Sequence, residues 1–246
     1  MALIWGRHPV YEALKAGRSV DRILMAEALR PSGLIADVLR LSAERNVQVQ
    51  RVDRKILDRM SAGANHQGVL AEVAEYQYRS LADLIAAAQG QPGLPWFLAL
   101  DSLEDPQNFG TLLRTADATG VTGVIIPLHR SVGVTPAVEK ASAGAVEYLP
   151  IARVTNLARS LQELKRHGYW AVGLDSTGDE IYDRFPVDVP LVLVVGAEGS
   201  GIGRLVRENC DVLVRLPMRG NVASLNAAVA GSIVLYDVLR RRGFSS

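Results

Sequence analysis

A polar turn leading into a helix carries the first residues capable of chemistry. Residues 105–117 read DPQNFGTLLRTAD, and Asn108 is predicted to cap the helix. Arg114 follows among small and apolar residues, which predicts a partly enclosed guanidinium. A permanently charged group in that position needs an anionic partner such as phosphate. Taken alone, the pattern is more typical of a capped helix with a surface arginine.

A glycine-rich loop carries the second set. Residues 194–203 read VVGAEGSGIG, in which Glu198 is the one ionisable side chain. The loop does not fit a dinucleotide-binding fingerprint, because the spacing is not G-x-G-x-x-G and the loop follows a late strand. It therefore presents backbone groups to some other close neighbour. The simplest role for Glu198 is to accept hydrogen bonds from amides of the turn.

The third set lies in residues 216–230, which read LPMRGNVASLNAAVA. A strand ends there, an irregular loop follows, and Ser224 is predicted to cap the last helix. Asn226 is a poor helix former, so its place at the start of that helix needs a local reason.

The elements that position these segments alternate between strand and helix. In the second half, strands are expected at 96–100, 123–127, 148–151, 169–174, 191–195 and 212–216, and helices at 109–119, 136–143, 155–167, 203–209 and 224–242. Strands such as 191–195 are apolar without alternation, which indicates a parallel sheet covered on both faces. Ligands of such sheets bind beyond the carboxyl ends of the strands, where all three segments lie.

The first 75 residues form a smaller α/β pattern. Strands are expected at 20–25, 47–51 and 68–73. One helix is expected to open at Pro9 and stop at Gly17, a second to span 32–45, and a third to be capped by Asp53. Residues 89–95 contain two Pro and two Gly and mark the clearest boundary. The sequence therefore predicts a domain at 1–75, a linker at 76–95 and a second domain at 96–246.

Composition narrows the class of protein. No apolar stretch reaches the roughly 20 residues of a membrane helix, and the N-terminus does not resemble a signal peptide. The single cysteine, Cys210, excludes an internal disulfide and favours a reducing cytoplasm. No cluster with metal-ligand spacing is visible, so no metal is expected. The net charge of +1 does not by itself indicate a nucleic-acid binder.

Together and in this order, the three segments resemble the three motifs of the SpoU/TrmH family of RNA ribose 2′-O-methyltransferases. The opening GRHPVYEAL and the HQGV strand at 66–69 look like the small L30e-like substrate-binding domain of many members. Within the family, the arrangement looks most like the 23S rRNA guanosine 2′-O-methyltransferases of the RlmB type. Ala228 departs from the serine that many members carry there.

The resemblance implies a SPOUT-type parallel-sheet catalytic domain with a C-terminal trefoil knot, an exception to the rule against threaded chains. It implies S-adenosyl-L-methionine as cofactor and a homodimer with the last helix near its interface. By position, the cofactor-binding residues are expected to be Leu174, Gly196, Ala197, Leu216, Met218 and Leu225.

The resemblance also implies catalytic roles for Arg114, Asn108, Glu198, Ser224 and Asn226. Arginine is a poor base, so Arg114 is expected to clamp an RNA phosphate and stabilise developing charge, with the other four fixing the ribose and the arginine. The expected partner is structured RNA, most of all 23S rRNA in the cytoplasm. A tRNA enzyme, a resistance-type rRNA enzyme and a non-catalytic RNA-binding or ribosome-assembly protein are the alternatives.

Overall fold

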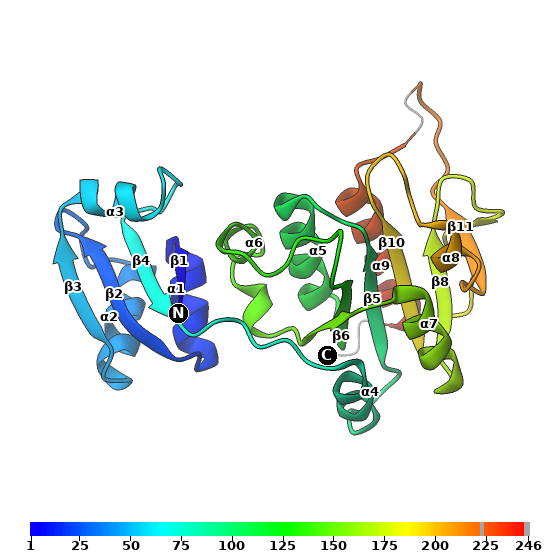
Figure 1. Ribbon diagram of the computed structural model, residues 1–246, viewed down its shortest axis with the longest axis horizontal. Helices are drawn as coiled ribbons and strands as arrows, with labels where there is room; N and C mark the ends of the chain where they lie inside the picture. The colour runs from blue at the N-terminus through cyan, green and yellow to red at the C-terminus, as the bar shows by residue number, and fades with distance from the viewer. Residues whose placement is uncertain (222–223, 244–246) are drawn as a thin grey trace. The chain divides into compact units, whose positions relative to one another are not determined.

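The computed structural model describes residues 1–221 and 224–243, which group into two compact units (Figure 1). Unit 1 contains Met1–Gln77 and Val134–Tyr148, and unit 2 contains Tyr78–Gly133 and the chain from Leu149 onward. Residues 134–148 thus group with the N-terminal part of the chain. The predicted domain limits at 75 and 96 stay a prediction.

Unit 1 is built on a four-stranded sheet with the order β1-β4-β2-β3. Its elements are β1 (Ala2–Trp5), α1 (Arg7–Ala16), β2 (Val20–Ala26), α2 (Leu34–Glu44), β3 (Gln48–Val52), α3 (Arg54–Met60), β4 (Val69–Val73), α6 (Pro136–Ala141) and the 3₁₀ helix η1 (Ala145–Glu147). Only β2 and β3 pair in parallel. The strand β1 was not predicted, because its four residues are all apolar and show no alternation with polar residues.

Two local signals in unit 1 act as the sequence predicts, but α1 begins at Arg7, so Pro9 is its third residue and does not open it as predicted. Gly17 ends α1 in the left-handed conformation at φ 84°, and its N–H reaches back to the Leu14 carbonyl. Asp53 caps α3 by accepting a 2.8 Å hydrogen bond from the Lys55 N–H. The apolar faces of α1 and α2 then pack on the sheet around Ile4, Ile23 and Met25, among others.

A buried ionic network lies inside unit 1. One nitrogen of Arg18, Nη1, contacts the Oε1 atoms of Glu139 at 3.0 Å and Glu147 at 2.7 Å. All three side chains are less than a tenth exposed. Burial raises the pKa of Glu139 to about 7, although Arg18 opposes the shift. In this network one guanidinium therefore faces two carboxylates, and little water is present to screen their charges.

Unit 2 is a seven-stranded sheet with the order β7-β6-β5-β10-β8-β11-β9, and every neighbouring pair is parallel. Its elements are α4 (Leu81–Gln89), β5 (Trp96–Asp101), α5 (Pro106–Ala118), β6 (Gly123–Pro127), β7 (Ile151–Val154), α7 (Leu157–Arg166), β8 (Trp170–Leu174), β9 (Glu180–Ile181), β10 (Leu191–Gly196), α8 (Arg204–Arg207), β11 (Val212–Arg215) and α9 (Ala227–Arg242). The predicted α/β class with a parallel sheet is confirmed. The predicted knot stays a prediction.

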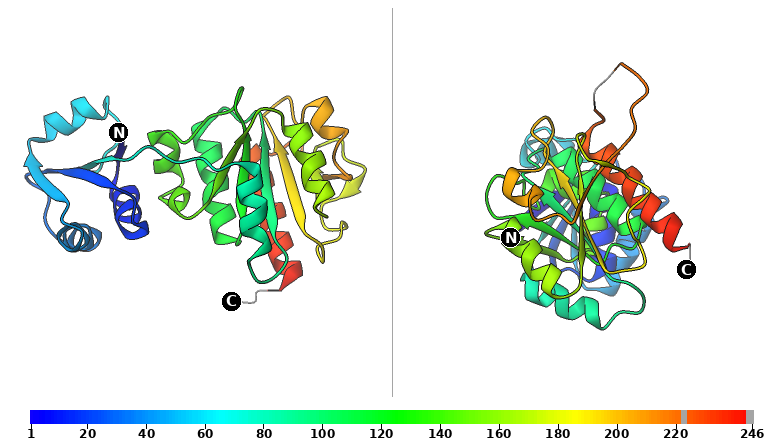
Figure 2. Two further views of the ribbon diagram at one scale, coloured as in Figure 1. Left: turned by 60° about the horizontal axis from the view of Figure 1, so that its bottom comes forward. Right: turned by 90° about the vertical axis from the view of Figure 1, so that its right-hand side faces the viewer.

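Helices cover both faces of this sheet. The apolar side chains of α4, α7 and α8 share one core cluster with alternate residues of the central strands. On the other face α5 packs against α9, and Figure 2 shows α9 (red) and α4 (teal) on opposite sides. Gly231 permits that packing, since a Cβ there would meet Leu112 at 2.7 Å. No helix in the described part of the chain has the length and apolarity to span a membrane.

One predicted strand is displaced. Residues 148–151 were expected as a strand, but η1 ends at Glu147 and β7 begins at Ile151. Pro150 lies between them and donates no backbone hydrogen bond, although its carbonyl accepts one from Val124. The strand that joins the sheet is therefore the next apolar run along the chain.

Candidate active site

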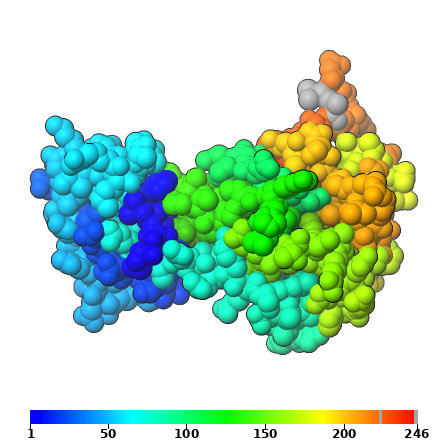
Figure 3. Space-filling model, in the orientation of Figure 1, coloured from blue at the N-terminus to red at the C-terminus, as the bar shows by residue number. Residues whose placement is uncertain are grey.

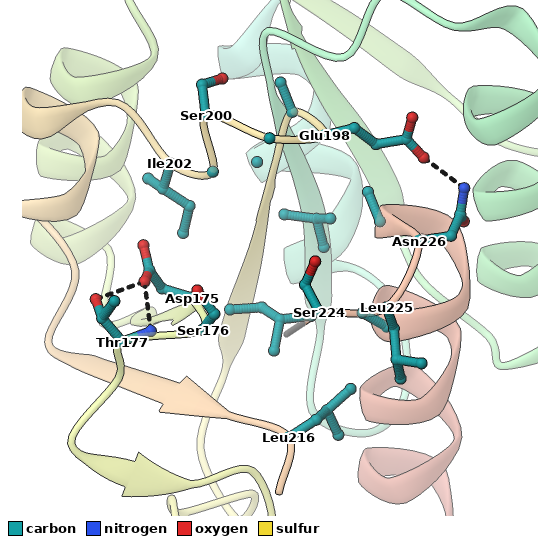
Figure 4. Close-up of a pocket in the computed structure, with 18 of the residues that line it drawn as sticks. Asp175, Ser176, Thr177, Glu198, Ser200, Ile202, Leu216, Ser224, Leu225 and Asn226 are labelled. Carbon is teal, nitrogen blue, oxygen red and sulfur yellow. Dashed lines mark hydrogen bonds between the residues drawn. The ribbon is translucent and has the colours of Figure 1, made fainter. Parts of the chain in front are cut away.

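A cavity of about 580 Å³ opens at the carboxyl ends of β8, β10 and β11 (Figure 4). It is lined by residues 174–177, 195–202, 224–227 and by Arg207, Leu216, Met218 and Ala230. The loop after β10 is tight, because Ala197 and Gly201 exchange backbone hydrogen bonds of 3.1 and 2.9 Å. A Cβ at Gly196 would overlap the Gly201 backbone, so only glycine fits there. We call this space the donor cavity.

The structure brings all six predicted cofactor-binding residues to the donor cavity: Leu174, Gly196, Ala197, Leu216, Met218 and Leu225. Met218 and Leu225 remain 38% and 41% exposed, so this space offers uncovered apolar surface to a ligand. Their contact with a cofactor stays a prediction.

A polar group that the sequence analysis missed lines the same cavity. Asp175, directly after β8, accepts hydrogen bonds from the Thr177 N–H at 2.8 Å and the Thr177 hydroxyl at 2.7 Å (Figure 4). Arg207 donates to its other oxygen at 3.1 Å. The available signal was a polar DSTG turn after a predicted strand, the position at which parallel sheets bind ligands.

Three predicted catalytic residues form one hydrogen-bonded network at the edge of the donor cavity. The Asn108 Nδ2 donates to Glu198 Oε1 at 2.7 Å, and the Asn226 Nδ2 donates to the same oxygen (Figure 4). The Asn226 Nδ2 also donates to Asn108 Oδ1 at 2.9 Å. Because both amides face a carboxylate, their NH₂ groups must point toward Glu198. We call these three residues the amide–carboxylate network.

Two predicted helix caps are wrong, and the corrections explain the network. Asp105, not Asn108, caps α5, accepting from the Gln107 N–H at 2.8 Å, so Asn108 lies buried in the first turn. Asn226, not Ser224, caps α9, its Oδ1 accepting from the N–H groups of Ala228 and Val229. The local reason for Asn226 is therefore that its oxygen caps the helix while its NH₂ group holds Glu198. Ser224 precedes the helix and lines the donor cavity.

Arg114 lies apart from these residues. Its side chain is exposed, outside the donor cavity, and it makes no hydrogen bond or ion pair with the residues that the structure describes. The prediction of a partly enclosed guanidinium is wrong. Residues 108, 112 and 116 define the buried face of α5, and Arg114 falls on the opposite side of a 3.6-residue turn.

A second cavity, of about 490 Å³, adjoins the donor cavity. It is lined by residues 102–105, Asn108, Arg130 and three residues of the glycine-rich loop, namely Ala197, Glu198 and Ser200. Those three residues also line the donor cavity. The amide–carboxylate network thus stands at the boundary of two spaces. We call the second space the acceptor cavity.

Comparison with known proteins decides the family. Residues 95–236 match the SpoU rRNA Methylase family, and residues 3–79 match the RNA 2′-O ribose methyltransferase substrate binding family. The chain belongs to the SpoU rRNA methylase family. The match spans every residue of the amide–carboxylate network.

Alignments with individual relatives span nearly the whole length of this chain. YacO of Bacillus subtilis, assigned to the TrmH family of tRNA/rRNA methyltransferases, is 48% identical over 237 residues, 96% of this chain and 94% of the relative. A TrmH family protein of Staphylococcus haemolyticus is 45% identical over 98% of this chain and 96% of its own.

Solved structures agree with this placement. The SpoU methyltransferase AviRb of Streptomyces viridochromogenes, solved in complex with AdoMet, matches with a TM-score of 0.80 and 26% identity, over 98% of this chain and 90% of that one. An AdoMet-bound rRNA methyltransferase of Sinorhizobium meliloti matches with a TM-score of 0.80 and 27% identity, over 98% and 87%. The likeness to these methyltransferase structures therefore extends over both units.

Proposed function

We propose that this protein transfers the methyl group of S-adenosyl-L-methionine to a ribose 2′-hydroxyl of a guanosine in 23S rRNA. The observation that carries the proposal is the amide–carboxylate network, which fixes one carboxylate between the donor and acceptor cavities. The SpoU family match and the AdoMet complexes of two structural neighbours support the methyl donor.

The donor cavity fits this cofactor. Ligand pockets usually measure about 300–1,000 Å³ and combine apolar walls with a few polar groups. Here Leu174, Leu216 and Leu225 supply apolar walls for an adenosine, and Asp175 and Ser176 supply oxygens for its hydroxyl groups. The cofactor supplies an activated methyl group, so the protein needs only to orient the acceptor oxygen and receive its proton.

Within the network, Glu198 has one oxygen committed to the two amides and the other without a partner among the described residues. The free oxygen accepts a hydrogen bond from the ribose hydroxyl and orients it toward the donor cavity. Asn108 and Asn226 hold the carboxylate in that position, and Ser224 contacts the ribose. These residue roles are proposals.

Arg114 is proposed to bind an RNA phosphate, and because it lies apart from the amide–carboxylate network it acts on RNA binding and not directly on the acceptor oxygen. Its exposure favours such a role, since a guanidinium without a protein partner is free to form a bidentate contact. The substrate-binding match over residues 3–79 supports target selection by unit 1. The expected compartment is the cytoplasm.

We further propose a homodimer through α9. Val229, Ile233 and Tyr236 lie at helical spacing on one face of this helix and are 47%, 38% and 49% exposed. A second copy of the chain would cover this strip. Light scattering at micromolar concentration should give twice the chain mass, and Ile233→Glu should reduce it toward the monomer.

The test of the proposed function is transfer of labelled methyl to unmodified 23S rRNA, with unmodified tRNA and 16S rRNA alongside. Label mapped to a guanosine 2′-oxygen in 23S rRNA is the expected result. Label in tRNA alone would overturn the substrate, and no label in rRNA, tRNA or a ribosome precursor would overturn the function.

A further inference from the structure

The acceptor cavity is lined by a positively charged side chain, Arg130, that the sequence motifs do not single out. Its walls carry three carboxylates, Glu104, Asp105 and Glu198. Among the described residues that line it, Arg130 brings the one positive charge. An anionic group entering this space is repelled by most of its wall and attracted at a single point.

Arg130 is free to bind such a group. Its side chain is exposed and has no hydrogen bond or ion pair with the described residues. Many other arginines of unit 2 are engaged, as Arg207 is with Asp175 and Arg242 with three backbone carbonyls. A guanidinium without a protein acceptor keeps all five donors for a ligand.

The backbone holds Arg130 beside the opposite wall of the cavity. β5 and β6 pair in parallel, so the turns that follow them emerge at the same edge of the sheet. The Val132 N–H donates to the Leu103 carbonyl at 2.9 Å, which ties the turn of Arg130 to the 102–105 wall. Arg130 itself has φ 56°, a conformation that is uncommon outside glycine. The segment after β6 (bright green) lies at the surface in Figure 3, where a polymer can reach it.

We propose that the acceptor cavity binds the target nucleotide and that Arg130 positions it by binding its phosphate. The inference rests on the proposed function, because an acceptor hydroxyl must lie about 3–3.5 Å from the methyl donor and so must occupy a contiguous space. The distribution of charge along the walls fixes the orientation of the bound nucleotide. The phosphate lies at Arg130, and the ribose hydroxyl lies at Glu198, on the side shared with the donor cavity.

The first test measures binding without catalysis. The full chain saturated with S-adenosylhomocysteine is titrated with guanosine 5′-monophosphate and with guanosine, following the backbone amide resonances of residues 102–105 by NMR. The wild type should bind the nucleotide about tenfold or more tightly than the nucleoside, as one charge-assisted contact predicts. Arg130→Ala should abolish that difference, and Arg159→Ala, which removes an exposed arginine of α7, should preserve it.

The second test uses RNA that the wild type methylates. Arg130→Ala should raise KM for RNA about 10- to 100-fold, with kcat changed much less and affinity for S-adenosylmethionine unchanged. The slope of log(kcat/KM) against log salt should fall in magnitude by about 0.7 to 1, the contribution of one phosphate.

Each failure has a distinct meaning. Equal binding of nucleotide and nucleoside by the wild type, or an unchanged preference in Arg130→Ala, overturns the role of Arg130. Loss of kcat at constant KM overturns it too, because a phosphate contact remote from the reacting oxygen acts on binding. A wild type that methylates no RNA refutes the proposed function, and the mononucleotide titration still decides whether Arg130 binds phosphate.

Discussion

Two networks of this chain hold carboxylates in different ways, one buried and one exposed. In unit 1, Glu139 and Glu147 share Arg18 in a setting where all three side chains are less than a tenth exposed. In unit 2, Glu198 is exposed and is held by the neutral amides of Asn108 and Asn226. A buried charge needs a countercharge, because desolvation is otherwise too costly. A carboxylate that must act on a ligand is better held by amides, which fix its position and leave one oxygen free.

The largest effect is expected from breaking the buried network. Arg18→Met leaves two buried carboxylates without a countercharge and should lower the free energy of unfolding by about 3–5 kcal/mol. Hydrogen exchange of amides in α1 and β2, measured in the full chain, reports the loss. The matched control is Arg22→Met, whose partner Glu72 is partly exposed, and which should cost far less because solvent screens this ion pair. Equal losses in the two variants would contradict the comparison.

The next effect is a pH dependence of stability that arises from Glu139 in the buried network. Burial raises the pKa of Glu139 from its usual 4.5 to about 7, so the folded state binds this proton more tightly than the unfolded state. The contribution of Glu139 to the free energy of unfolding is complete below about pH 4.5 and is lost as pH rises through about 7. The change amounts to about 3 kcal/mol. Urea denaturation between pH 5 and 8 should show this fall in the wild type and a flatter profile in Glu139→Gln. Parallel profiles would refute the shift.

Removing the exposed carboxylate should affect activity and leave stability nearly unchanged. Glu198→Ala should lower kcat about 100-fold, since a misplaced acceptor costs that much. Glu198→Gln keeps an oxygen that accepts from both amides, so it should recover part of the loss if position matters more than charge. Methyl-transfer kinetics with the RNA that the wild type methylates provides the measurement. Thermal unfolding is the control, and a shared loss of stability would show that the network supports the fold instead.

The smallest effect separates the two roles of Asn226. Asn226→Ala removes both the α9 cap and the donor to Glu198, and should cost about 1 kcal/mol of stability together with activity. Asn226→Asp keeps an oxygen for the cap but places a second carboxylate against Glu198. It should unfold within about 0.5 kcal/mol of the wild type and still lose turnover. Full activity in Asn226→Asp would show that the donor is unnecessary.

Much of the scaffold follows from the sequence because strong local signals dominate it. Uninterrupted apolar runs such as Leu191–Gly196 require burial on both faces, and Gly17 and Asp53 end or begin helices by local chemistry. The caps at Asn108 and Ser224 were misplaced because Asp105 and Asn226, two or three residues away, are equally good cap residues. Asn108 and Asn226 both bind Glu198, which is distant in sequence from Asn108. Three-dimensional neighbours of this kind leave no periodic signal.

The candidate site shows the same limit. Most residues of the three motifs line the donor or the acceptor cavity. Asp175 and Arg130 line these cavities too, but they lie in turns with no motif and become visible only when neighbouring strands are paired. Arg114 shows the opposite error, a motif residue that was predicted to be enclosed and is exposed. Its apolar neighbours in the sequence lie on the other side of the helix.

The order of strands in unit 2 has a consequence for synthesis of the protein. β10 forms the middle of the sheet, and its first residue, Leu191, pairs with Trp96 of β5. While the ribosome is still extending the chain, β5, β6 and β7 can pair with one another, but β5 keeps an open edge until β10 has emerged. The donor cavity also needs Leu216, Met218 and residues 224–227, so it is complete later still. Such long-range pairing slows folding. A nascent chain therefore exposes a strand edge while the residues between β5 and β10 are being made, and it gains the capacity to bind a methyl donor only near its completion.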